Sequence, residues 1–240
     1  MNKFLKISVI MLFVIALLIT GGILMSKDKK PLHEQIAEYM FNSRALPKLE
    51  YCVEKYGDEF ELSDVGSVIS TRFPAFKVRL VWSEEEQTYK DDYIVYLQKE
   101  EIESILFPLA YDVFSECKLF AYPYHVCPSY FDKNTTAIEL LSVSEKDGPV
   151  VQIDIFTTKD PSQKDSDVQE FTKSIQKLGY SVCVNIEYLS NTSYEMVNGD
   201  NHRSSEVISK TFYRYFGSML ILPDSFNWVP SNSSWREGEG

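Results

Sequence analysis

Apolar and polar positions divide the start of the chain into an uncharged run and a helix. Residues 7–25, ISVIMLFVIALLITGGILM, carry no charged side chain. At about 1.5 Å per residue, this run would span roughly 28 Å as a helix, close to the thickness of a hydrocarbon core. We therefore predict a transmembrane helix over 7–25. A second helix is predicted over 32–56, with Pro47 inside it.

The stretch LEYCVEKYGDEFEL at 49–62 changes its periodicity at Gly57. Apolar residues before the glycine recur at helical spacing, and those after it alternate with polar residues as in a strand. Glycine adopts the left-handed conformation that ends a helix without steric cost. The stretch therefore predicts a helix that stops at Gly57 and leads into a strand, with its acidic side chains on a solvated face.

The remaining pattern predicts a run of strands and helices with hairpins. We expect a hairpin from 75–82 and 93–97, and then helices over 99–116, 136–143 and 165–178 and strands over 118–122, 150–156, 181–188 and between 206 and 216. This order favours an α+β fold, an antiparallel sheet with helices packed on one face. Each half contains a strand, a helix and a strand, which leaves open two similar β-α-β halves.

These elements give five regions along the chain. They are a short basic N-tail at 1–6, a transmembrane signal anchor at 7–25, a basic juxtamembrane linker at 26–31, an extracytoplasmic α+β domain at 32–230 with a possible sub-boundary near 130–147, and a polar frayed tail at 231–240.

The segments EKYGDEFEL, FKVRLVW and DDYIVYL resemble a set of uncharacterised membrane-anchored proteins of Gram-positive bacteria. Their shared form is roughly YLxxKYGxxFxV, followed by a strand and D-x-Y, and the match covers residues 49–97. This chain departs from it at Cys52, which replaces an apolar residue, and at Asp92, which directly precedes Tyr93. The resemblance implies an extracytoplasmic module and supplies no catalytic residue.

The apolar run also fixes the expected localisation, the cell membrane with a single pass. We expect the N-terminus inside and the domain outside, because a short tail before one span is typical of a signal anchor and long domains translocate largely regardless of charge. Charge counting slightly favours the opposite orientation, because more basic residues follow the run than precede it. A cleaved signal peptide is the alternative, since Thr20 and Gly22 are small residues suited to positions before a cut.

Charge narrows the expected partners of the domain. Residues 1–30 hold five lysines and one aspartate, so the rest carries 19 basic and 34 acidic residues, a net charge of −15. Such a surface repels nucleic acid and anionic polymers, and we expect no nucleic-acid partner. The expected partners are the lipid bilayer, through residues 7–25, and an envelope protein of unknown identity.

The cysteines permit disulfides without choosing among them. Cys52, Cys117, Cys127 and Cys183 allow two bridges with three pairings, or four buried free thiols. The segment YHVCP would place His125 and Cys127 on the same side of an extended chain, as in a thiol and imidazole pair or a partial metal site. Its spacing matches no standard zinc pattern, so a structural loop is favoured.

No set of residues in the sequence converges on a reaction. The adjacent acids Asp91 and Asp92 would point to opposite faces of a strand, and the other acidic pair falls in the first turn of a helix. We assign no catalytic, cofactor-binding or metal-ligating residue and expect no cofactor. The leading hypothesis is a non-enzymatic binding or assembly protein of the cell envelope. The alternatives are a structural subunit of an envelope-spanning secretion or conjugation apparatus, and an envelope enzyme of unknown type.

Overall fold

The computed structural model describes residues 32–144, 147–199, 203, 213–229 and 234–238. The chain separates into two compact units, Met1–Arg44 and Ala45–Gly240. The predicted transmembrane helix at 7–25 lies outside the described residues. Within the described part, no helix combines the length and apolar character needed to cross a membrane.

The first helix ends where its glycine predicts. Helix α2 spans Leu32–Tyr56 and contains Pro47. Gly57 follows with φ at +112°, and its N–H donates to the Val53 carbonyl at 2.9 Å, which closes the last turn. The chain then forms an antiparallel hairpin of β1 (Phe60–Leu62) and β2 (Val68–Ser70). The predicted helix stop and following strand are confirmed.

The second predicted strand of the next hairpin is wrong. Strand β3 (Leu80–Ser83) pairs with β4 (Thr88–Asp91), and 93–97 instead forms a short helix, α3 (Tyr93–Leu97). Its first three residues are fully buried, and a short continuous apolar run fits a buried helix as well as a strand. The Asp91 side chain accepts the Tyr93 N–H at 2.9 Å, which favours a chain reversal after β4.

The next elements follow the predicted order. Helix α4 spans Lys99–Phe114, strand β5 spans Cys117–Pro123 and helix α5 spans Ala137–Leu141. Helix α5 starts at a capping box in which Thr136 and Glu139 satisfy each other's backbone N–H groups. On the outer edge of β5, the Ala121 N–H donates to the Glu103 carboxylate of α4 at 2.8 Å. A side chain therefore protects this sheet edge against pairing with another strand.

The largest sheet is built by the second half of the chain. After α5, the chain forms β6 (Val151–Thr157), the 3₁₀ turn η1 (Pro161–Gln163), α6 (Lys164–Lys177), β7 (Val182–Leu189), α7 (Asn191–Met196), β8 (Tyr213–Leu222), β9 (Ser225–Trp228) and β10 (Arg236–Glu237). These strands join β5 in one sheet. The six strands have the order β10-β8-β7-β6-β5, with β9 also paired to β8.

The α+β class is confirmed, and the sheet is mixed rather than antiparallel. Strands β6 and β7 run parallel because α6 connects them as a crossover, while the other neighbours are antiparallel. The strands β1 to β4 lie in two separate two-stranded sheets. In the described part of the chain, only β6-α6-β7 forms a parallel β-α-β unit, because β4 and β5 on either side of α3 and α4 belong to different sheets, so the two halves are not similar.

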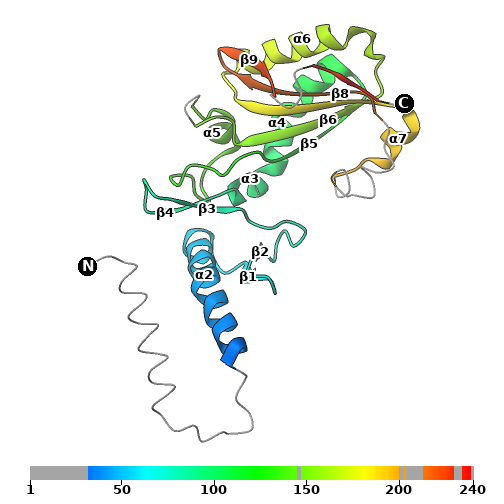
Figure 1. Cartoon of the computed structure of the whole chain (residues 1–240). Helices are drawn as coiled ribbons and strands as arrows, with labels where there is room; N and C mark the ends of the chain where they lie inside the picture. Colours follow the sequence, from blue (N-terminus) through cyan, green and yellow to red (C-terminus); the bar gives the residue numbers. More distant parts are fainter. Residues whose placement is uncertain (1–31, 145–146, 200–202, 204–212, 230–233, 239–240) are drawn as a thin grey trace, which may run out of the picture. The chain divides into compact units, whose positions relative to one another are not determined.

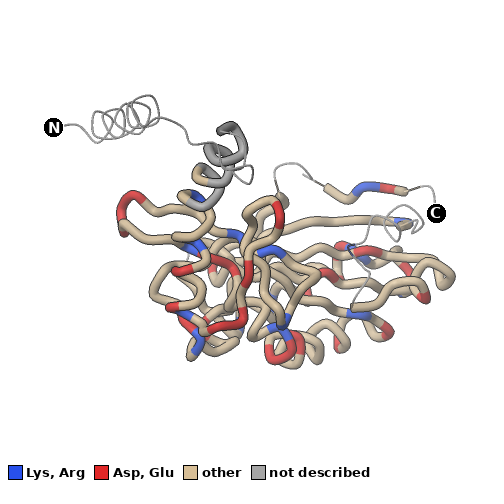
Figure 2. The backbone as a smooth tube through the Cα atoms, turned by 90° about the horizontal axis from the view of Figure 1, so that it is seen from below, with Lys and Arg blue, Asp and Glu red and all other residues tan. Residues whose placement is uncertain are grey.

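Helices α4 and α6 pack together against one face of this sheet (Figure 1). Phe114 of α4 contacts Phe171 of α6 and Tyr188 of β7, with ring centroids 5.7 and 6.4 Å apart. The short helix α7 contributes Tyr194 to a small apolar cluster that includes Phe156. The strand alternation places Phe156 on the opposite face, so α7 covers part of that face. Acidic residues are spread over many parts of the chain (Figure 2).

The region expected to be a frayed tail is partly ordered. Arg236 and Glu237 form β10 against β8. The Trp235 ring lies edge-on to the rings of Tyr188 and Trp228, at centroid distances of 5.6 Å each, and its Nε1–H donates to Asp165 at 2.8 Å. The tail prediction missed this anchor because a single tryptophan outweighs the polar residues around it.

Candidate functional site

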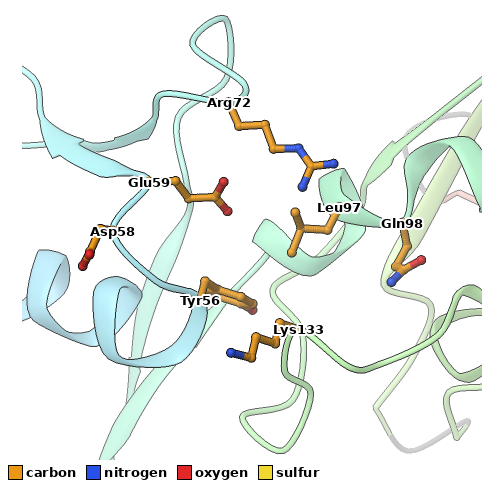
Figure 3. A pocket seen from close by; sticks show the side chains of 7 residues that line it. All are labelled: Tyr56, Asp58, Glu59, Arg72, Leu97, Gln98 and Lys133. Carbon is orange, nitrogen blue, oxygen red and sulfur yellow. The ribbon is translucent and has the colours of Figure 1, made fainter.

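One pocket of about 470 Å³ lies beside the end of α2. Four separate segments contribute to it: the α2 terminus, the β1–β2 hairpin, the α3–α4 junction and the loop before α5. Its lining residues are Tyr56, Asp58, Glu59, Arg72, Leu97, Gln98 and Lys133 (Figure 3).

The acidic side of the pocket is held by a buried tyrosine. The Tyr93 hydroxyl donates to the Glu59 carboxylate at 2.7 Å and also lies 2.9 Å from the Ser70 hydroxyl. The rings of Tyr56 and Phe60 pack edge-on or tilted against Tyr93 and against each other. Glu59 is therefore fixed before any ligand arrives. The Asp58 carboxylate points away from the other side chains (Figure 3).

The basic side of the pocket comes from two loops. Arg72 follows β2, where its backbone N–H donates to the Ser70 hydroxyl at 3.1 Å, and its guanidinium lies over the Phe73 ring. Lys133 lies in a loop that Gln98 holds in place, because the Gln98 amide donates to the Thr135 carbonyl at 2.9 Å. Both basic side chains are exposed.

The two cations lack counterions in the described part of the chain. No carboxylate there lies within ion-pair distance of Arg72 or Lys133. The lining holds two acids and two bases, so its formal charge is balanced, and the hydrogen bond from Tyr93 orients Glu59 without neutralising it. Leu97 adds an apolar surface to the pocket (Figure 3). This combination suits a small ligand with a carboxylate and an apolar group.

Behind the pocket, Asp91 is the centre of a buried polar network. Its Oδ1 accepts hydrogen bonds from the Tyr56 hydroxyl at 2.8 Å and the Tyr93 N–H at 2.9 Å. Its Oδ2 accepts from the Tyr51 hydroxyl and the Lys55 ammonium, each at 2.8 Å. Burial, followed by the charge of Asp91, raises the pKa of the Tyr56 hydroxyl. Every acceptor site of this carboxylate is used, so the network positions Tyr56 rather than offering a free base.

The neighbouring Asp92 belongs to a different network. Its carboxylate accepts from the Arg79 N–H at 2.9 Å and from the Arg79 Nε at 3.0 Å. Burial raises the pKa of this carboxyl, although Arg79 opposes the shift. The two adjacent acids do not converge, in agreement with the sequence interpretation.

The structure separates His125 from Cys127. His125 is exposed and lies against the Tyr124 ring, whereas Cys127 is buried and its N–H donates to the Asp91 carbonyl. The four cysteines are all buried and free. Burial raises the pKa of Cys117 to about 11 and that of Cys52 to about 12, so these thiols remain protonated. The expectation that His125 and Cys127 share one side is wrong.

A second polar cluster lies on the sheet face opposite α4 and α6. The Asp154 carboxylate accepts from the Asn185 amide at 2.8 Å and from the Tyr122 hydroxyl. Glu187, two residues along β7 from Asn185, has its pKa raised to about 7 by burial and then by the charge of Asp154. No hydrogen bond to the Glu187 carboxylate is found among the described residues.

Sequence reasoning missed the pocket because its members are scattered. Asp58 and Glu59 were interpreted as solvated acids, and Arg72, Gln98 and Lys133 carry no motif. Across the described ranges, no group of three or more histidine, cysteine or acidic side chains is placed to hold a metal ion.

Comparison with known proteins adds little. No protein-family model and no curated protein matches the sequence. A crystal structure of a DUF5037 family protein from Ruminococcus gnavus ATCC 29149 aligns with a TM-score of 0.42 and 17% identity, over 78% of this chain and 95% of that one. A likeness at this level shows neither a shared fold nor a shared function.

Proposed function

We propose that this chain is a membrane-anchored binding or assembly protein of the cell envelope, non-enzymatic, with its α+β domain outside the membrane. The proposal rests on the uncharged run at 7–25 for the anchor and on the pocket for binding. The resemblance of residues 49–97 to membrane-anchored proteins of Gram-positive bacteria favours the same place.

The observation that supports the binding role is a pair of exposed basic side chains at the pocket that form no ion pair with any described residue. Arg72 and Lys133 come from different loops, and hydrogen bonds to Ser70 and Thr135 hold those loops in place. A guanidinium can bind a carboxylate through two parallel hydrogen bonds, and an ammonium adds a second charge. The ligand class that fits is a small molecule or peptide end with a free carboxylate and an apolar side group.

Binding is tested by NMR titration of the uniformly ¹⁵N-labelled full chain in detergent micelles. The probe is an N-acetylated leucyl-leucine dipeptide with a free carboxyl end, and the same dipeptide with an amidated end is the control ligand. We expect saturable shifts around Arg72 and Lys133 with the free acid alone. Each of Arg72→Ala and Lys133→Ala should weaken binding by about threefold to tenfold, the loss of about one charged contact.

The exposed Lys173→Ala variant on α6 is the matched control, because it removes the same charge far along the sequence. Equal responses to both dipeptides, or equal losses from all three variants, would contradict a carboxylate site. The anchor is tested separately by adding protease to intact, wall-stripped cells. Degradation of residues 31–240 is expected, and protection until the membrane is permeabilised would contradict the topology.

A further inference from the structure

The outer edge of β3 has unpaired backbone groups. The Cys127 N–H donates to the Asp91 carbonyl at 2.6 Å, so Asp91 points its backbone groups away from β3. Leu80 is directly opposite Asp91 in the ladder and therefore points its own N–H and C=O away from β4. Alternation gives Trp82 the same direction. No described residue forms a hydrogen bond to these outward groups of Leu80 or Trp82.

The neighbouring hairpin covers only the residues before β3. The Val78 N–H donates to the Val68 carbonyl at 3.0 Å, and Lys77 forms an isolated bridge with Ile69. Pairing with β2 stops there. The edge at Leu80–Trp82 differs from the edge of β5, where Glu103 occupies the Ala121 N–H.

The side chains at this edge are apolar and half exposed. Val81 is 49% exposed and Trp82 is 44% exposed, although Trp82 contacts the Tyr89 ring of β4. Adjacent strand residues point to opposite faces, so a strand added at this edge would cover both. Exposed apolar edge strands are templates for pairing with another chain.

Charges around β3 are arranged in opposite sign at its two ends. Lys77 and Arg79 precede the strand, and Glu84, Glu85 and Glu86 follow it. Glu86 already pairs with Lys90, whereas Lys77, Glu84 and Glu85 form no ion pair with a described residue. Antiparallel pairing of this strand with its own copy would bring the basic end of each copy next to the acidic turn of the other.

We propose that two copies of this chain pair through the outer edges of their β3 strands, antiparallel and about a two-fold axis at Val81. A two-fold axis between two antiparallel copies of one strand makes one residue face its own copy. Pairs along such a ladder alternate between hydrogen-bonded and non-hydrogen-bonded, so the direction of the backbone groups decides which kind of pair that residue forms. Because Leu80 and Trp82 supply the outward groups, they bond to each other across the dimer and Val81 faces Val81. In this register, the basic residues before β3 of one copy lie near the acidic turn of the other, with Lys77 and Glu85 each four positions from Val81.

A second copy of the chain would be the partner in the proposed assembly function. The pairing itself does not depend on that function, and only its role in the envelope rests on it. Confinement to one membrane would further raise the effective concentration of the copies. The β3 strands of two copies would then join their hairpins into one four-stranded sheet.

The test is disulfide crosslinking of the full chain in detergent micelles under mild oxidation with copper phenanthroline. In a non-hydrogen-bonded pair, the Cβ atoms are close enough for a disulfide, so Val81→Cys should form covalent dimer at least about fivefold faster than the control. The control is Val65→Cys in the β1–β2 turn, which is 74% exposed and off the edge. The four native cysteines are buried and give little background.

A charge exchange in the Val81→Cys background tests the register. Lys77→Glu or Glu85→Lys alone should slow the crosslink, and both together should restore it. Crosslinking no faster than that of Val65→Cys would overturn the proposal, and indifference to both charges would overturn the antiparallel register. The measurement needs neither membrane insertion nor the pocket, so its failure is distinct from a failure of the proposed function.

Discussion

Replacing Asp91 with asparagine should remove most of the stability that the polar network behind the pocket supplies. Asparagine keeps Oδ1, which accepts from Tyr56 and from the Tyr93 N–H. It places an amide NH₂ where Oδ2 accepts from Tyr51 and Lys55. Donors then face donors, and the Lys55 ammonium, whose side chain is 11% exposed, loses its counterion.

The size of the effect follows from these losses. Breaking a buried ion pair by removing one partner typically costs about 3 to 5 kcal/mol, because the remaining charge stays buried. We expect a similar decrease in the free energy of unfolding for Asp91→Asn. Tyr51→Phe removes a single hydrogen bond to the same oxygen and should cost about 1 to 2 kcal/mol.

The assay is equilibrium urea unfolding of the full chain in mild detergent, followed by tryptophan fluorescence. Asp92→Asn is the matched control, since Asp92 is equally buried but its partner Arg79 is 48% exposed and can be solvated. Asp92→Asn should lower the free energy of unfolding by about 1 to 2 kcal/mol. A loss below about 1 kcal/mol for Asp91→Asn, or one no larger than the control's, would refute the reasoning.

Three further perturbations use the same unfolding assay. Gly57→Ala should lower the free energy of unfolding by about 1 to 2 kcal/mol, because a φ of +112° strains alanine even though no atom lies within 4 Å of the added Cβ. The exposed Glu54→Gln should lower it by less than about 0.5 kcal/mol. Equal small effects would contradict the helix-stop role. The pKa of Glu187 is raised from 4.5 to about 7, so the folded state binds the extra proton and stability should fall by about 2 kcal/mol as pH rises from 5 to 7.5. Glu187→Gln should remove that part of the slope, and an unchanged slope would show that Glu187 is not the group responsible. Gly217→Ala would place a Cβ 2.7 Å from a Trp235 ring carbon. It should lower the free energy of unfolding by about 1 to 3 kcal/mol and shift the tryptophan fluorescence to the red. An unchanged stability and spectrum would contradict this packing.

The fold was predictable from the sequence where the apolar pattern was long or ended at a glycine. Helix α4 has apolar residues on one stripe over four turns, and Gly57 and Gly179 mark the ends of α2 and α6 with positive φ. Tyr93–Leu97 was misassigned because five apolar residues have no period that separates a buried helix from a strand. What decides the case is the Asp91 carboxylate, whose burial arises from contacts far away in sequence.

The candidate site was less predictable than the fold. Its members come from positions 56 to 133, and only the tertiary arrangement brings Arg72 and Lys133 to one pocket. The β3 edge is an intermediate case. Its alternation and flanking charges are visible in the sequence, but whether its outer edge is covered depends on where β2 stops pairing, which the sequence does not encode locally.

The docking of Trp235 has a consequence for how the domain matures. Synthesis adds Trp235 after every residue that it touches, including Asp165, Tyr188 and Trp228. The surface around Gly217 therefore stays open until Trp235 is free to dock, and a chain truncated before that residue would present this apolar surface to proteases. A chain cut before position 235 would therefore differ from the full domain by an exposed apolar surface, and not only by a missing polar segment.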